Sequence, residues 1–228
     1  MRQSRIKQNP LDYYWPHAKG CDGKSCYKIV NTYTDTFGMN YKVKGCPQYY
    51  FHISQADVRA FFGANRSGKT TAGAVEILFH ATGMYPDWYP VERRYPRSVK
   101  GRILASDFKK AVGEVITESL NAWIPPETLL NRDKNPQGIY DKYFIRHKSG
   151  GISTFDIITY EQDVGVAEGW SGDFAWYDEP PPRPHRIATA RGLIDRMGFE
   201  IFTLTPLKEA YLFDELWVPG NKIGGDNE

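Results

Sequence analysis

The stretch from Gly63 to Thr70 holds the residue types that bind the phosphates of a nucleotide. It reads G-A-N-R-S-G-K-T, a complete G-x-x-x-x-G-K-[ST] pattern. In such a loop the backbone N–H groups point inward at phosphate oxygens, and glycine permits backbone angles that a Cβ would obstruct. Lys69 can reach the β- and γ-phosphates, and the Thr70 hydroxyl can ligate Mg²⁺. The pattern predicts a nucleotide-phosphate site; the alternative is a Gly/Ser surface turn.

The residues between the two glycines belong to the same predicted site. Three roles are open for Arg66: a phosphate contact that assists catalysis, a contact to a neighbouring subunit, or a surface position. Fifteen residues before the loop, Gln48 could read an adenine edge, because its amide carries both donors and an acceptor. The predicted loop contacts are Gly63, Ala64, Asn65, Arg66, Ser67, Gly68, Lys69, Thr70 and Thr71.

Two acids at the end of an apolar segment could complete the chemistry. Residues 174–177 are apolar, and Asp178 and Glu179 follow at once, which is the order of a Walker B strand. Asp178 would hold Mg²⁺ opposite Thr70. Glu179 would orient, or accept a proton from, the water that attacks the terminal phosphate. The alternative is a solvated Asp-Glu pair in a turn.

Thr205 ends the next apolar segment along the chain, directly before Pro206. A hydroxyl at this place could sense the γ-phosphate and relay its loss to the rest of the protein. A plain strand end before a proline is the other interpretation.

The elements around these residues occur in the order that such a site needs. Val58–Phe62 precedes the loop as a buried strand, and residues 70–81 follow with apolar side chains at helical spacing until Gly83, a typical C-cap. Further strands are predicted over residues 102–105, 140–146, 152–159, 174–177 and 200–205, and helices over 108–123, 185–197 and 209–217. This alternation predicts an α/β fold, a mainly parallel sheet flanked by helices, with the loop, the acid pair and Thr205 at one edge.

Size and composition indicate one α/β domain with a small appendage. The chain has 228 residues, 41% hydrophobic and 25% charged, and its formal net charge of +2 neither requires nor excludes nucleic acid. No apolar run approaches the ~20 residues of a membrane span, and no signal-peptide core follows the N-terminus, so we expect an intracellular protein. Residues 1–47 are predicted to form an N-terminal extension and residues 48–228 the phosphate-loop domain.

The three cysteines, Cys21, Cys26 and Cys46, are an odd number, which argues against a disulfide framework inside a cell. Together with His17 they could form a four-ligand zinc site. The Cys-x₄-Cys spacing is looser than the usual zinc knuckle, so ordinary reduced cysteines are the preferred interpretation.

Taken together, these motifs resemble the ATPase domain of the large terminase subunit of tailed double-stranded DNA phages. The resemblance covers about residues 48 to 217. Its most specific pieces are Gly63–Gly73, Thr82–Trp88, Gly169–Gly172, Asp178–Pro181 and Thr203–Leu207.

The resemblance implies a P-loop NTPase of the additional-strand catalytic-glutamate type, similar to RecA. Members of the family form a homo-oligomeric ring on the portal vertex and use ATP hydrolysis to move viral DNA into a procapsid. It implies ATP and Mg²⁺ as cofactors. It implies three partners: double-stranded DNA, bound without sequence preference, the portal protein and the small terminase subunit. The location would be the host cytoplasm and, transiently, the portal vertex of the procapsid.

The resemblance also assigns roles to single residues. Gln48 matches the adenine motif, and Lys69 and Thr70 match the phosphate and metal contacts. Asp178 matches the metal-binding acid and Glu179 the catalytic base. Thr205 matches the motif that couples hydrolysis to movement.

Two departures from the family pattern affect these expectations. Relatives usually carry a C-terminal nuclease domain, but this chain ends about 50 residues after Glu179, so no nuclease activity is expected from this chain alone. Many relatives also place an arginine shortly before the second acidic motif, and residues 164–177 contain none. Other candidates for an arginine that acts on a neighbouring subunit are Arg146, Arg183, Arg186, Arg191 and Arg196.

Two alternatives to a packaging motor are weighed. A helicase-like translocase uses the same motifs but needs a second, similar domain. A non-catalytic, ATP-dependent assembly module would not need the intact Glu179.

For DNA contact, the turn Lys148–Gly151 beside Arg146 and His147 could touch backbone phosphates, although an exposed basic turn is the commoner explanation.

Overall fold

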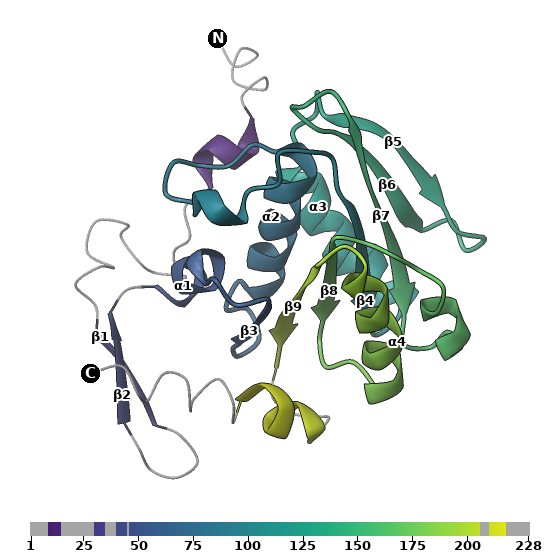
Figure 1. The fold of residues 1–228 in the computed structure, drawn as a ribbon. Coiled ribbons are helices and arrows are strands. Elements are labelled where there is room, and N and C mark those ends of the chain that lie inside the picture. The colour runs from purple at the N-terminus through teal and green to yellow at the C-terminus, as the bar shows by residue number, and fades with distance from the viewer. Residues whose placement is uncertain (1–8, 15–29, 35–39, 45, 206–209, 218–228) are drawn as a thin grey trace.

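The protein is built around a seven-stranded sheet in the order β3-β9-β8-β4-β7-β6-β5 (Figure 1). The computed structural model describes residues 9–14, 30–34, 40–44, 46–205 and 210–217. The strands that run parallel are β3 (Val58–Phe62), β4 (Lys100–Ala105), β7 (Ile152–Thr159), β8 (Phe174–Asp178) and β9 (Phe199–Leu204). β6 (Tyr140–Arg146) and β5 (Leu129–Lys134) add an antiparallel edge. The predicted α/β fold with a mainly parallel sheet is confirmed.

The two faces of the sheet carry separate hydrophobic cores because side chains alternate along each strand. On β8, Phe174 and Trp176 pack into the core that includes α2 (Lys69–Thr82). Ala175 and Tyr177 point the other way, into the core that includes Ala188 of α4 (Arg183–Ile194). Figure 1 shows α2 and α4 on opposite faces, so helices flank the sheet as predicted.

Helix α2 follows the phosphate-loop sequence and is buried along nearly its whole length. It begins after Gly68 and ends at Gly83, whose φ of 71° is the left-handed cap that the sequence predicts. Inside the helix, a Cβ on Gly73 would lie 2.5 Å from the Trp176 ring. Glycine therefore lets the helix approach β8, which brings its first turn to the end of that strand.

The remaining elements show where the sequence prediction was incomplete. The helix predicted over residues 108–123 is a π-helix, η4 (Phe108–Ile116), that continues as α3 (Thr117–Trp123), and the Asp107 carboxylate caps it by accepting from Lys110 N. α1 (Pro47–Ile53), the sheet strand β5 and the short 3-10 helices were not predicted. The other elements are η1 (Pro10–Tyr13), β1 (Val30–Thr34), β2 (Asn40–Lys44), η3 (Val91–Arg93), η5 (Val164–Ala167) and η6 (Phe213–Trp217).

Part of the segment preceding residue 48 packs on the core. Leu11 and Tyr14 are buried, and the Tyr14 hydroxyl lies 2.9 Å from His52 Nε2 of α1. The domain boundary at residue 47 stays a prediction. Within the described ranges, no helix combines the length and apolarity that crossing a bilayer requires.

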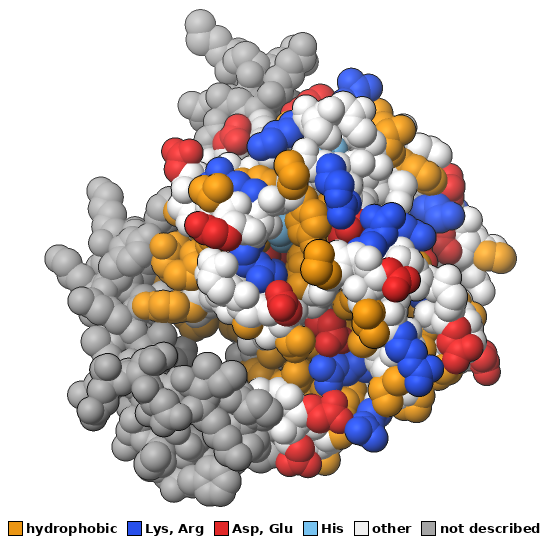
Figure 2. Space-filling model, in the orientation of Figure 1, with side chains coloured by type: hydrophobic (Ala, Val, Ile, Leu, Met, Phe, Trp, Pro, Cys, Tyr) orange, Lys and Arg blue, Asp and Glu red, His pale blue; other side chains and the backbone are white. Residues whose placement is uncertain are grey.

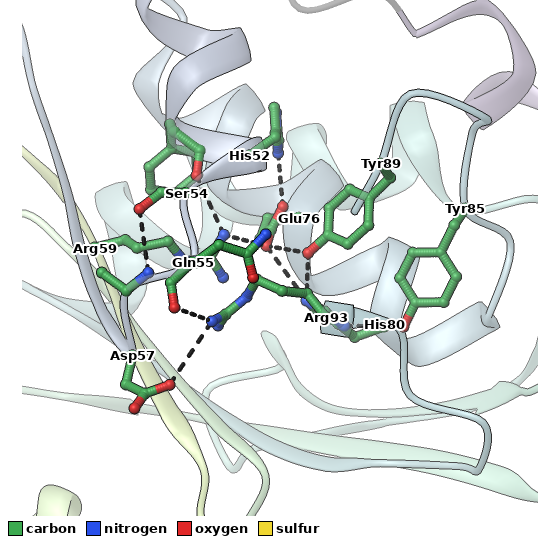
Figure 3. Close-up of polar contacts among 12 residues, drawn as sticks. His52, Ser54, Gln55, Asp57, Arg59, Glu76, His80, Tyr85, Tyr89 and Arg93 are labelled. Carbon is green, nitrogen blue, oxygen red and sulfur yellow. Dashed lines mark hydrogen bonds and ion pairs between the residues drawn. The ribbon is translucent and has the colours of Figure 1, made fainter. Parts of the chain in front are cut away.

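A buried ionic cluster joins α2 to α1 and β3 (Figure 3). The Glu76 carboxylate lies 2.6 Å from Arg59 Nη1 and 2.6 Å from His52 Nδ1, and it accepts a 2.7 Å hydrogen bond from the Tyr89 hydroxyl. His80 Nε2 lies 3.3 Å from the same carboxylate. Burial alone would raise the pKa of Glu76, but Arg59 and the hydrogen bonds from the two histidines hold it well below its ordinary value. The cluster fixes the helix that carries Lys69 and Thr70.

Candidate functional site

The loop between β3 and α2 contains two residues with left-handed backbone angles. Arg66 and Gly68 have positive φ angles of 64° and 84°, and Gly63 N donates a 3.1 Å hydrogen bond to Leu204 O of β9. A Cβ on Gly63 would lie 2.7 Å from Ser67 Oγ, and one on Gly68 would lie 2.4 Å from Gln48 Nε2. At both positions a Cβ would clash with a neighbouring side chain, so glycine is required. Gly68 also has a φ angle that other residues rarely adopt.

Lys69 and Ser67 leave polar atoms that suit an anion in this loop. The Lys69 side chain is nearly buried and its ammonium donates to Ala64 O at 3.0 Å. Among the described residues, no carboxylate lies within ion-pair distance of that ammonium. Ser67 Oγ is buried without a hydrogen-bond partner. A buried ammonium with spare donors, next to an unpartnered hydroxyl at a helix N-terminus, fits a phosphate group.

Gln48 lies next to the loop, where the adenine hypothesis needs it. It belongs to α1, is buried, and donates from Nε2 to Gly68 O at 3.2 Å. One of its two amide donors is thereby engaged with the loop. Adenine recognition by Gln48 stays a prediction.

Asp178 ends β8 and lies against the first turn of α2. Its Oδ1 accepts hydrogen bonds from Thr70 Oγ1 at 3.1 Å and from Thr203 Oγ1 at 2.7 Å. Burial raises the pKa of Asp178 to about 6, against the opposing effects of the two hydroxyls and of Lys69. A carboxylate beside a hydroxyl supplies the hard oxygen ligands that Mg²⁺ prefers, so this pair fits the predicted metal.

Thr203 is a site residue that sequence reasoning did not assign. Its hydroxyl donates to Asp178 and accepts a 2.8 Å hydrogen bond from Trp176 Nε1. The indole thus orients the threonine, and the threonine orients the carboxylate. The signal was present in the sequence, because Thr203 lies two residues before Thr205 on the same predicted strand.

Glu179 has a strained backbone that is held on several sides. Its φ is 70°, in the left-handed region that a glutamate rarely adopts. Glu179 N donates to Thr203 O at 3.0 Å, and its carbonyl accepts a 2.9 Å hydrogen bond from the Tyr160 hydroxyl. Its carboxylate accepts from Thr205 N at 3.0 Å and from Thr205 Oγ1 at 3.1 Å. Tyr160 was missed by sequence reasoning, although it directly follows a predicted strand, as Asp178 does.

A cavity of about 450 Å³ brings the loop and the second acid together. Its size lies in the range of small-molecule sites. The side-chain oxygen of Asn65 is 3.3 Å from Thr205 Oγ1, so the loop, Thr205 and Glu179 form one continuous wall. The cavity is lined by Asn65, Ser106, Tyr160, Glu161, Glu179, Pro180, Pro182 and Thr205.

The arginine candidates for a neighbouring subunit do not converge on this cavity. Arg183 and Arg186 pair with Glu215 at 3.0 and 2.6 Å, and Arg196 pairs with Asp173 at 3.2 Å. Arg146 ends β6 beside the start of β7, which is the opposite edge of the sheet from the loop. Arg191 is exposed on α4. The choice among them stays open.

Arg66 lies within the loop and is exposed to solvent. This position is compatible with each of the three roles that the sequence leaves open for it. Its contact with phosphate or with a neighbouring subunit stays a prediction.

The zinc hypothesis lies mostly outside the described residues, because His17, Cys21 and Cys26 all do. Cys46 is described; it is buried directly before α1. No group of three or more metal-ligating side chains is found in the described part of the chain. Zinc binding stays a prediction.

Comparison with known proteins identifies the family. Residues 60–222 match the model of the N-terminal part of the terminase large subunit, T4-like virus type. The chain belongs to the terminase large subunit family. A curated member of this family, the large terminase subunit of Salmonella phage P22, is 29% identical over 183 residues. That match covers 65% of this chain and 36% of the relative, so the chain spans about a third of the length of this large terminase.

Solved large terminase structures share the fold. One crystal form of the large terminase from a thermophilic bacteriophage gives a TM-score of 0.54 at 10% identity, covering 74% of this chain and 42% of that one. A second crystal form of the same terminase gives 0.51 at 9% identity, covering 76% and 39%. At this identity the likeness concerns the fold alone, and the role of each residue depends on the geometry above.

Proposed function

We propose that this chain is the ATP-hydrolysing motor part of a large terminase, which packages viral double-stranded DNA into a procapsid. The observation that carries the proposal is the arrangement of two acids around one loop. Asp178 contacts Thr70 directly, and Glu179 shares a cavity with Asn65 of the same loop. An acid that could bind the metal and a base that could activate water therefore lie beside one loop that could bind phosphate.

The strand order supports a P-loop NTPase of the additional-strand, catalytic-glutamate type, similar to RecA. β9 lies between the loop strand β3 and the acid-bearing strand β8. Because these three strands are parallel neighbours, their carboxyl ends are adjacent. Thr205 therefore follows the strand between the loop and Glu179, where it can respond to both.

The residues of the chain would divide the reaction as follows. The loop N–H groups and Lys69 hold the β- and γ-phosphates, and Thr70 with Asp178 holds Mg²⁺. When bound, Mg²⁺ neutralises charge that develops on the phosphate oxygens. The Glu179 carboxylate orients the attacking water and accepts its proton. Thr205 donates to both carboxylate oxygens of Glu179, so the base must exchange at least one of these hydrogen bonds before it binds water.

The proposal for partners follows from the family. We propose a ring of copies at the portal vertex, with the portal protein, the small terminase subunit and double-stranded DNA as partners, and the host cytoplasm as the location. Arg183 and Arg186, on the helix that follows Glu179, are both paired with Glu215. A neighbouring copy is therefore a reasonable source of further positive charge at the cavity.

Steady-state phosphate release from Mg-ATP tests the proposal. Glu179→Gln keeps the shape but removes the base, and we expect a rate at least about 100-fold lower with ATP binding retained. Glu168→Gln, the same change at an exposed site after η5, is the matched control and should hydrolyse ATP at the wild-type rate. Equal rates in wild type and Glu179→Gln would rule out the motor. Lys69→Ala should abolish ATP binding, and unchanged binding would rule out the loop assignment.

One observation favours a second candidate, an ATP-dependent assembly module without turnover. Both carboxylate oxygens of Glu179 are engaged by Thr205, which would suit a base held out of action. This candidate predicts tight ATP binding with no difference in phosphate release between wild type and Glu179→Gln, so the same experiment separates the two.

A further inference from the structure

Asp173 organises the edge of the sheet opposite to the nucleotide cavity. It lies directly before β8 and is fully buried. Its carboxylate accepts from Lys100 N at 2.7 Å, from Arg97 Nη2 at 2.8 Å and from Arg196 Nη1 at 3.2 Å. Burial would raise the pKa of Asp173, but the hydrogen bonds from Arg97 and Lys100 and the charge of Arg196 keep it below its ordinary value. Asp173 is therefore a fixed anion with two guanidinium partners.

The two arginines are bound by the buried Asp173 carboxylate, but their side chains are partly exposed to solvent. The Arg97 and Arg196 side chains remain 51% and 41% exposed, whereas the Asp173 side chain is 0% exposed. Two cations share one carboxylate, so the trio keeps a positive charge. Because a guanidinium has five N–H donors, each arginine retains donors that face solvent. A pre-positioned arginine also loses less side-chain entropy when it binds an anion.

Three further exposed cations lie along the same edge: Lys100 at the start of β4, and Arg146 and Lys148 around the turn before β7. The turn is next to residue 98, since a Cβ on Gly151 would lie 2.6 Å from Ser98 Oγ. We name the basic edge for its five members, Arg97, Lys100, Arg146, Lys148 and Arg196. Figure 2 shows Lys and Arg side chains grouped above the centre of this face, over the region where the parallel strands begin in Figure 1.

The extent of the basic edge suits a nucleic acid duplex. It runs across β9, β8, β4 and β7 to the end of β6, five neighbouring strands of the sheet. At a strand spacing of about 4.8 Å, five strands extend over about 19 Å, a length along which one strand of a duplex carries about five or six phosphates. Three exposed acids, Asp57, Glu92 and Asp195, lie toward the β3 and β9 end, so the positive charge concentrates toward β4 and β7.

We propose that the basic edge binds the phosphate backbone of double-stranded DNA without reading its sequence. This inference rests on the proposed packaging function, and it assigns the DNA surface to the edge opposite the nucleotide cavity. Arginine forks match phosphate oxygens, and contacts to phosphate position a duplex without sequence information. Of the predicted hairpin contacts, Arg146 and Lys148 are kept. His147 is not, because it is buried and burial lowers its pKa.

Direct DNA binding tests the proposal without ATP. The probe is a fluorescently labelled 30-base-pair duplex of mixed sequence, titrated with the full chain by anisotropy at several salt concentrations. Arg97→Gln/Arg196→Gln should weaken binding about tenfold or more at low salt. It should also reduce the slope of log K against log salt by about 2, equally for two unrelated sequences. Lys109→Gln/Lys110→Gln removes the same charge from exposed positions on η4, at the other edge, and should change neither quantity.

A second variant covers the risk that Asp173 without its partners disturbs folding. Lys100→Gln/Lys148→Gln leaves the Asp173 ion pairs intact and should weaken binding in the same direction, with circular dichroism and the thermal midpoint as folding controls. Equal losses in the η4 control and the basic-edge variants, or no duplex binding by wild type, would overturn the proposal. If the protein bound the duplex through Arg97 and Arg196 but did not hydrolyse ATP, DNA binding by the basic edge would be supported and the proposed motor function would be rejected.

Discussion

Two buried carboxylates beside the same helix have opposite surroundings. Glu76, within α2, has Arg59 at 2.6 Å as a counter-ion, and its pKa is held well below its ordinary value. Asp178 contacts the first turn of α2, but its hydrogen bonds come from the neutral hydroxyls of Thr70 and Thr203. Burial therefore prevails there and raises the pKa to about 6.

The difference separates a structural acid from one that awaits a ligand. A buried carboxylate with its own cation is neutralised within the fold and has no need of another charge. A buried carboxylate that is served only by hydroxyls gains when a cation arrives from outside. Asp173, with Arg97 and Arg196, follows Glu76 in this respect, although its partners reach the surface.

Removing the Asp178 charge should have the largest effect, a loss of activity without a loss of stability. Asp178→Asn keeps an oxygen for Thr70 and Thr203 but loses the anion that would hold Mg²⁺. We expect phosphate release to fall by about 10³-fold, the equivalent of several kcal/mol of lost metal stabilisation. The free energy of unfolding should stay the same or rise, because an uncompensated buried charge is removed. A Mg²⁺ titration of phosphate release, with EDTA as the zero point, measures the first effect and urea unfolding the second.

Removing the Glu76 charge should have the opposite effect, a loss of stability and not of ATP hydrolysis. Glu76→Gln leaves the Arg59 guanidinium buried without a counter-ion, so the free energy of unfolding should fall by about 3–5 kcal/mol. Urea unfolding at pH 7 measures the loss. The double variant Glu76→Gln/Arg59→Met, which removes both charges, should recover a large part of it. If Glu76→Gln instead lost ATP hydrolysis at unchanged stability, the structural assignment of Glu76 would be wrong.

Tyr160 should act on the rate through the position of Glu179. Tyr160→Phe removes the hydroxyl that donates to the Glu179 carbonyl and leaves the ring in place. We expect kcat to fall about tenfold, roughly the value of one lost hydrogen bond at a strained residue, with KM for ATP unchanged. A change in KM without a change in kcat would assign Tyr160 to nucleotide binding instead. Glu161→Gln, a change at the neighbouring residue on the cavity wall, is a useful comparison.

Acid should weaken the Glu76 cluster in two steps. Burial, opposed by Glu76, lowers the pKa of His80 below 6.5, so the unfolded chain binds this proton more readily and stability falls as the pH drops below about 6.5. The pKa of Glu76 is also depressed, so its contribution is present above its ordinary pKa near 4.5 and is lost below it. Each group contributes at most about 1.4 kcal/mol per pH unit. In Glu76→Gln the second fall should disappear, as chemical unfolding measured from about pH 8 down to about pH 2 would show.

The sequence was sufficient to predict the positions of the site residues that follow apolar strands. The loop, Asp178, Glu179 and Thr205 each come directly after such a strand, and parallel strands end at a common edge, so their convergence could be expected. The same rule would have found Tyr160, had it been applied to the end of residues 152–159.

Other parts of the fold depend on contacts between distant residues. The α1 sequence P-Q-Y-Y-F-H-I has weak helix propensity, and its helix is stabilised by burial of Gln48, Phe51 and His52. β5, L-L-N-R-D-K, is a polar edge strand without β-branched residues, so no pattern marked it. Glu76 and His80 are four residues apart, a spacing that is typical of an exposed pair on a helix. Their burial depends on Arg59, which comes from strand β3.

Helix α2 touches both edges of the sheet. Its first residue is Lys69 of the phosphate loop, and near its end the Thr82 carbonyl accepts a 2.8 Å hydrogen bond from Lys148 N, in the turn that carries part of the basic edge. Fourteen helical residues correspond to about 21 Å, without a proline to bend them. A shift of the loop along the helix axis would therefore be transmitted almost undiminished to Lys148. The chain has a stiff mechanical link between the place where it would hold ATP and the place where it would grip DNA.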